Sequence, residues 1–232
     1  MMGWLMALIA MALFCTAGVW QWRRMHEKQA SLDASHQILG ERKAEPLSIA
    51  ADTHRARSYD WVAGAGTFDA RGALLLDNQQ SGGRSGVRVY RIFVPEQGGP
   101  LLVDLGWLPL GGERKLPRIP RIGGRVELRG LLMPPPSTGL VLGAGMTREG
   151  DNWLLTRVDP IAIASNTGLS AALAPRVLRI DPTLPIGYAR DLEILPNTLP
   201  PQRHLGYAVQ WFALALAVFV TAVILTFRKS RR

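Results

Sequence analysis

Two uncharged apolar runs, one near each end of the chain, constrain its fold more than any other feature. The first extends from Trp4 to Trp22, and the second extends from Gly206 to Phe227 with Gln210 as its one strongly polar side chain. A helix of this length reaches about 30 Å, which is the thickness of the hydrocarbon core of a bilayer. The sequence therefore predicts a membrane protein with transmembrane helices at 4–22 and 206–227.

The basic residues beside these runs predict how the helices cross the membrane. Two spans leave both termini on one side, and cytoplasmic segments are enriched in Lys and Arg. The chain ends in a basic tail, 228–232, which we place in the cytoplasm. Residues 23–203 then form a domain in the periplasm, outside a bacterial inner (plasma) membrane. Arg23, Arg24 and Lys28 oppose this orientation, but the tail holds four cations.

A cleaved signal peptide is the alternative interpretation of the first run. Signal peptides begin with basic residues and have a shorter apolar segment. No Lys or Arg precedes this run, and bulky Phe14 precedes Cys15 where a lipoprotein signal has a small residue. These features favour a helix that is retained.

The central residues have the pattern of a sheet that follows a helix. Residues 23–39 contain no Gly or Pro, which predicts that the first helix continues into the domain. Short apolar or alternating segments then recur between turn residues. They predict strands at 59–68, 73–76, 87–94, 100–107, 125–133 and 176–180. A short helix is expected at 159–166, and the prolines beyond residue 181 predict an extended loop.

The expected fold class is a β-rich α+β extracytoplasmic domain, with an antiparallel sheet or barrel, flanked by an N-terminal and a C-terminal transmembrane α-helix. Gly64 and Gly66 inside the first strand indicate a bulge or a close approach of two backbones. The single Cys15 excludes an intrachain disulfide and a Cys–His metal cluster.

Charge and motifs exclude several classes of function. Much of the formal net charge of +9 lies beside the two apolar runs, as expected of membrane anchors, so nucleic-acid binding is not predicted. The chain has no P-loop, dinucleotide fingerprint, metalloprotease helix or nucleophile elbow. Four histidines offer few candidates for acid–base catalysis, and the sequence predicts no enzyme.

Two histidines stand beside the apolar runs. His26 follows the first and His204 precedes the second, so antiparallel packing of the helices puts them at similar depth. Imidazole is a common axial ligand of haem iron, and an aromatic-lined apolar cleft suits a porphyrin. The cations that could pair with haem propionates are Arg23, Arg24, Lys28 and Arg203. The plainer alternative is that these side chains are solvated histidines and ordinary membrane anchors.

Four segments carry a resemblance that covers nearly the whole chain. They are Gly18–Arg24 (GVWQWRR), Gly66–Asp69 (GTFD), Leu101–Pro109 (LLVDLGWLP) and His204–Phe212 (HLGYAVQWF). Together, and in this order, they resemble the surfeit locus protein 1 family, whose members assist the assembly of cytochrome c oxidase. Asp104 and Leu105 depart from the family's usual Asn and Arg.

The resemblance implies a non-catalytic assembly factor that binds haem a and passes it to oxidase subunit I, with haem a synthase as a further candidate partner. It implies haem-iron ligation by His204. Trp20 and Arg24 become candidates for ring packing and propionate pairing, and Tyr207 and Trp211 complete the expected binding residues. The alternative from another class is a membrane scaffold that stabilises oxidase subunits without binding haem. A membrane-anchored periplasmic enzyme is a third hypothesis, which a pocket holding a strongly perturbed carboxylate or His54 would favour.

Overall fold

The computed structural model describes residues 2–111, 116–136, 145–194 and 199–230, with the side chains described as far as residue 228. The chain divides into two compact units. One unit contains Met1–Ala34 and Ile194–Arg232, and the other contains Ser35–Glu193. Each is described by itself. Arg231 and Arg232 of the predicted basic tail lie outside the described residues.

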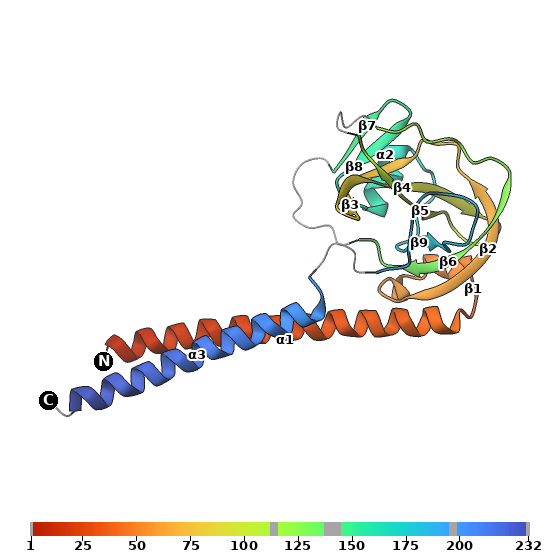
Figure 1. The fold of residues 1–232 in the computed structure, drawn as a ribbon. Helices are drawn as coiled ribbons and strands as arrows, with labels where there is room; N and C mark the ends of the chain where they lie inside the picture. Colours follow the sequence, from red (N-terminus) through yellow and green to blue (C-terminus); the bar gives the residue numbers. More distant parts are fainter. Residues whose placement is uncertain (1, 112–115, 137–144, 195–198, 231–232) are drawn as a thin grey trace. The chain divides into compact units, whose positions relative to one another are not determined.

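The first unit is built from two long helices. Helix α1 spans Met2–Glu41, and helix α3 spans Pro201–Ser230. Both are long and apolar enough to cross a membrane. The predicted spans lie within them, and α1 continues without a break through the helix predicted at 23–39. Figure 1 shows α1 in red and orange and α3 in blue.

The less exposed side chains of both helices recur at alternating steps of three and four residues. On α1 they include Ala7, Met11, Phe14, Gly18, Gln21, Met25 and Lys28. On α3 they include Pro201, His204, Ala208, Trp211, Ala215, Val218 and Ala222. This is the 3.5-residue spacing of a coiled-coil seam, and we call these two rows the seam.

Contacts along the seam show that the two helices pack antiparallel. Trp4 donates a hydrogen bond of 2.9 Å to Thr226 near one end. Further along α1, the rings of Phe14 and Trp211 pack with centroids 5.7 Å apart. Since residues early in α1 meet residues late in α3, the chain leaves one helix and enters the other at the same end of the pair.

The second unit is a nine-stranded mixed sheet with one short helix. Its strands are β1 (Glu45–Pro46), β2 (Asp60–Phe68), β3 (Leu74–Ser81), β4 (Arg84–Pro95), β5 (Leu101–Pro109), β6 (Arg125–Met133), β7 (Met146–Glu149), β8 (Asn152–Leu155) and β9 (Val177–Ile180). Helix α2 spans Pro160–Thr167, and two 3₁₀ turns span Leu47–Ala51 and Thr53–Arg55. The strand order is β1-β2-β6-β9-β5-β4-β3-β8-β7, and a further pairing of β2 with β4 closes β2, β6, β9, β5 and β4 into a ring, as in a small barrel.

The sheet is mixed rather than purely antiparallel, which corrects that part of the predicted fold class. Strands β1 and β2, β3 and β8, and β5 and β9 pair parallel, whereas the other neighbours pair antiparallel. Parallel pairing needs a long return path. The chain between β5 and β9 supplies one, because it forms β6, β7, β8 and α2 before it returns.

Both faces of the central strands are buried, which explains why most of their side chains are apolar. Val89 and Phe93 of β4 face one hydrophobic cluster, whereas Tyr90 and Ile92 face a second. Gly66 of β2 lies where a Cβ atom would stand 2.3 Å from the Val94 carbonyl oxygen. The close backbone approach predicted for this strand is therefore present.

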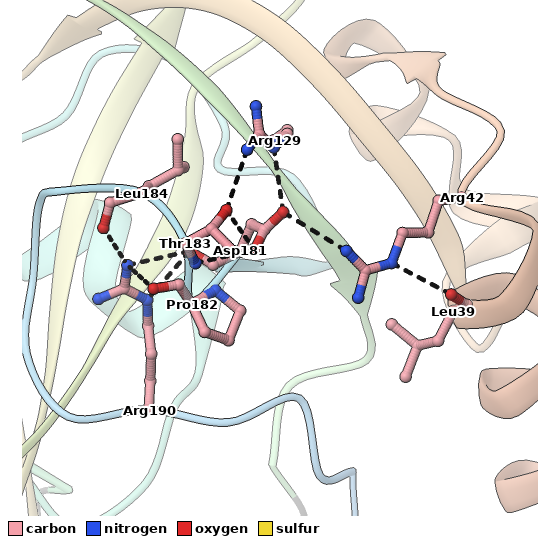
Figure 2. Close-up of polar contacts among 8 residues, drawn as sticks. All are labelled: Leu39, Arg42, Arg129, Asp181, Pro182, Thr183, Leu184 and Arg190. Carbon is pink, nitrogen blue, oxygen red and sulfur yellow. Dashed lines mark hydrogen bonds and ion pairs between the residues drawn. The ribbon is translucent and has the colours of Figure 1, made fainter.

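Asp181 forms a polar hub just after β9. Its carboxylate accepts a hydrogen bond of 3.0 Å from Arg129 and bonds of 2.9 Å from the Thr183 backbone and hydroxyl groups. Arg42, one residue beyond α1, lies 3.8 Å from the same carboxylate, and its guanidinium also donates to the Leu39 carbonyl (Figure 2). Leu39 and Arg42 belong to the second unit, and within that unit the hub joins them to the end of β9.

Candidate functional site

His204 lies on the seam and is almost fully buried, with 6% of its surface exposed. Its Nδ1 atom is 2.7 Å from the side-chain Oε1 of Gln21 on α1. Its Nε2 atom is buried and has no hydrogen-bond partner among the described residues. The two side chains meet because each occupies a seam position, so they form a polar layer between largely apolar ones.

The unpartnered Nε2 atom decides whether this site fits a metal-bound cofactor. A buried polar atom without a partner costs about 1–3 kcal/mol, so its presence calls for a functional reason. An imidazole whose second nitrogen is already held by another side chain is the usual form of a protein metal ligand. His204 therefore fits the role of haem ligand that the sequence resemblance assigned to it.

The residues just before α3 are held to α1 at Leu199, a little more than one helical turn before His204. Lys28 is 8% exposed, and its ammonium group donates a hydrogen bond to the Leu199 carbonyl oxygen. The Arg203 backbone N–H donates to the Pro200 carbonyl at 3.0 Å. In this structure Lys28 therefore links α1 to the start of α3 through a hydrogen bond. The sequence suggested Lys28 as a partner for a haem propionate.

Aromatic rings line the seam beyond His204, toward the C-terminal end of α3. Trp211 lies two turns further along α3 and is half-buried against Phe14. Gly18 of α1 lies opposite Phe212, whose ring would stand 2.7 Å from a Cβ atom at that position. The predicted residue Trp211 therefore lies on the same face of α3 as His204. Beside it, Gly18 and Phe212 are so close that a larger residue than glycine at position 18 would force the Phe212 ring to move.

The other predicted binding residues lie on the outside of the helix pair. Trp20 is 59% exposed and Tyr207 is 38% exposed, and neither has a hydrogen bond or ring contact with His204 in the described part of the chain. Arg24 is exposed and pairs with Glu27 at 3.0 Å. Trp20 and Arg23 share a shallow hollow along α1 whose other lining residues are Cys15, Thr16 and Val19. The structure thus brings His204 and Trp211 onto one face and leaves Trp20, Arg24 and Tyr207 accessible from outside.

His26, the second histidine of the sequence-based hypothesis, does not join His204 in the described contacts. Its ring is exposed and packs edge-on against Trp22, with centroids 5.1 Å apart. Gln21 takes the place opposite His204 instead, and sequence reasoning missed it as a site residue. The signal was present, because Gln21 lies seven residues from both Phe14 and Lys28 on the same helical face.

The two residues that depart from the family pattern lie inside the sheet. The Asp104 carboxylate accepts hydrogen bonds from Arg88 at 2.7 Å and from Arg179 at 3.0 Å, and all three side chains are buried. Burial opposes ionisation of Arg88, but the Asp104 carboxylate raises the Arg88 pKa above its ordinary value. Leu105 is buried in the hydrophobic cluster of the ring. Both residues therefore serve the fold of this domain.

The second unit has a hollow of about 600 Å³ beside β2 and β6. Its charged lining residues are held in ion pairs. Arg125 contacts Glu96 at 2.6 Å and Glu127 at 3.3 Å, and Arg129 contacts Asp181, outside the lining, at 3.0 Å. The hydrogen bond from Arg125 lowers the pKa of Glu96, as in an ordinary surface ion pair. His54 does not line it. The shift of the Glu96 pKa comes from this ion pair, so it gives the enzyme hypothesis no support.

Comparison with known proteins supports the resemblance drawn from the four segments. A family model described as the SURF1 family matches residues 8–216. This range includes the seam from Met11 to Ala215 and the whole sheet. A search of curated proteins finds no match. The family predicted from the sequence is confirmed.

Proposed function

This chain belongs to the SURF1 family, and from that premise we propose that it binds haem a and passes it to subunit I of cytochrome c oxidase. The family is known for cytochrome oxidase assembly, and it is an assembly-factor family rather than a catalytic one. The observation that carries the proposal is the buried, unpartnered Nε2 atom of His204.

The proposed place of action is the bacterial inner membrane, with spans at 4–22 and 206–227, the domain 23–203 in the periplasm and the tail 228–232 in the cytoplasm. Large apolar side chains are exposed along both helices, which is costly in water and favourable in lipid. Trp20 and Tyr207 are among the exposed side chains, and amphipathic rings favour the headgroup level.

Binding would rest on a few side chains of the helix pair. Haem iron offers a coordination position that an imidazole nitrogen fills. His204 would supply that nitrogen, and Trp211 and Trp20 would pack against the apolar ring. Arg24 would pair with a propionate, for which it would leave its exposed partner Glu27.

Uptake and release would depend on access to His204. Its Nε2 atom is enclosed in this structure, so ligation requires the side chains around that atom to move. Lys28 holds the start of α3 to α1 through one hydrogen bond, to the Leu199 carbonyl. An opening that breaks this bond and keeps the contact of His204 with Gln21 suits a carrier that must let go of its cargo.

The experiment is an absorption spectrum of the chain purified from cells that make haem a. The wild-type protein and the His26→Ala variant should carry haem a, and His204→Ala should not. His26→Ala is a matched control because His26 is exposed on the same helix pair and packs on Trp22. An unchanged spectrum in His204→Ala would refute ligation by His204.

The scaffold alternative makes a different prediction for cells that lack haem a. A scaffold should still cross-link to oxidase subunit I in those cells, whereas a carrier should lose most of that contact. Cross-linking that persists at the wild-type level, together with a haem-free purified protein, would favour the scaffold. The same experiment with haem a synthase tests whether that enzyme supplies the cargo directly.

A further inference from the structure

Gln21 faces His204 through an atom that can only accept a hydrogen bond. The contact joins His204 Nδ1 to Gln21 Oε1 at 2.7 Å, a normal hydrogen-bond length. A neutral imidazole carries its single proton on one nitrogen and a lone pair on the other. With the amide oxygen facing the ring, as in this structure, the contact favours a proton on Nδ1 and a lone pair on Nε2.

From this contact we infer that Gln21 is a positioning residue, which fixes the tautomer and ring orientation of His204 so that Nε2 is presented as a haem ligand. The inference rests on the proposed function and adds to it the residue that prepares the ligand. A metal-bound histidine commonly donates its second N–H to an oxygen, which orients the ring and raises its basicity. The Gln21 amide oxygen is such an acceptor.

The seam explains why Gln21 can hold the ring so firmly. Gln21 is half-buried on α1 between Gly18 and Met25, and His204 is buried on α3 between Pro201 and Ala208. A polar pair inside an apolar seam has few alternative partners, so it fixes the register of the two helices as well. The same contact therefore sets the depth of His204 along α1 and the nitrogen that it leaves unprotonated.

The first test measures the tautomer in the haem-free chain. We would record nitrogen NMR spectra of ¹⁵N-histidine-labelled protein in lipid nanodiscs at a pH where imidazole is neutral, and assign His204 from a His204→Ala sample. The expected result is a protonated Nδ1 and an unprotonated Nε2 in the wild type, and a mixture of tautomers in Gln21→Leu. A wild-type His204 that is protonated on Nε2 would overturn the inference, because the Gln21 amide would then be the donor.

The second test measures haem affinity and midpoint potential in the purified full-length chain. Loss of a partner behind a metal ligand typically lowers affinity about 10–100-fold, and we expect this for Gln21→Leu. Its potential should rise, since a less basic imidazole stabilises ferric iron less. Gln21→Glu keeps an acceptor oxygen, so it should retain affinity within a few-fold and shift the potential downward.

The control is Gln29→Leu on the same helix. Gln29 bonds Asp33 of its own helix at 2.8 Å, so its loss should leave affinity, potential and tautomer unchanged. Equal affinity and potential in wild type and Gln21→Leu would overturn the inference and leave the proposed function standing. A wild-type chain that takes up no haem would instead refute the proposed function, while the tautomer in the haem-free chain would still decide whether Gln21 positions His204.

Discussion

At the scale of single residues, Asp104 shows how a departure from a family pattern can be built into the fold. Its carboxylate lies between Arg88 and Arg179 and also accepts the Gly106 backbone N–H at 3.0 Å. Buried cations need a partner of opposite charge, because desolvation costs each of them several kcal/mol. Asp104 supplies this charge from inside the strand.

We expect Asp104→Asn to destabilise the chain by about 3–5 kcal/mol, since it leaves two arginines buried without a counter-charge. Urea denaturation in detergent, followed by tryptophan fluorescence, measures the change. Asp151→Asn is the control, because Asp151 is exposed in the turn between β7 and β8 and should change stability little. A loss below about 1 kcal/mol for Asp104→Asn would show that the network is unimportant.

Asp181 should make stability depend on pH in acid. Burial opposes ionisation of this carboxyl, but hydrogen bonds from Thr183 and Arg129 outweigh it and lower the Asp181 pKa below its ordinary value of 3.8. A lowered pKa in the folded state gives stability that is complete well above pH 3.8 and lost as the pH falls through the folded pKa. The hub drawn in Figure 2 should therefore weaken in strong acid.

Comparison of wild type with Asp181→Asn by urea denaturation across this range tests the hub. The stability difference should be largest near neutral pH and should shrink as the pH falls below about 3.8. A difference that stays constant over this range would mean that Asp181 acts through packing and not through its charge.

At the scale of elements, the two helices approach each other closely at Gly18. A Cβ atom there would lie 2.7 Å from the Phe212 ring, whereas Gly3 of the same helix has nothing within 4 Å. Gly18→Val should therefore destabilise the helix pair by about 1–3 kcal/mol through overpacking. Thermal unfolding of Gly18→Val, with Gly3→Val as the matched control, measures this.

A second substitution distinguishes overpacking from an effect on helix propensity. Phe212→Ala makes room opposite residue 18, so it should relieve part of the damage caused by Gly18→Val when the two are combined. Equal destabilisation by Gly18→Val and Gly3→Val would contradict a close contact at Gly18.

The elements that could be predicted from the sequence are those whose pattern is local. The strand predicted at 125–133 has those bounds in the structure, and the helix predicted at 159–166 is α2, capped by Asp159 at its start and Gly168 at its end. Strands β1, β7 and β8 were missed, because each is two to four residues long and depends on a neighbouring strand for its hydrogen bonds.

At the scale of the whole molecule, pairings between distant segments could not be predicted. The ring closes through hydrogen bonds such as that from the Asp69 backbone to Ile92, and β9 joins β5 in parallel after a long connection. Neither the closure of the ring nor the pairing of β9 with β5 produces a periodic pattern of residues in the sequence. The two terminal helices were predicted because bilayer thickness demands a length and a polarity that can be counted along the chain.

Of the two residues that meet at the candidate site, the sequence pointed to one and not to the other. His204 was singled out by its place beside the second apolar run and then by the family segment. Gln21 was missed, because nothing in the sequence around it shows that a histidine of the other helix faces it. Trp20, Arg24 and Tyr207 remain predictions, since no haem contact has tested them. Their exposure is compatible with a ligand that approaches the helix pair from outside.

The central claim is that His204 is the residue that binds haem iron, and a change of ligand tests it most directly. A methionine at this position is close in size and offers sulfur in place of nitrogen, and Met ligation raises the potential of haem iron. We predict that His204→Met retains some haem a, with an altered absorption spectrum and a higher midpoint potential than wild type. A spectrum and a potential identical to those of wild type would contradict the claim, because the iron would then be held by another residue.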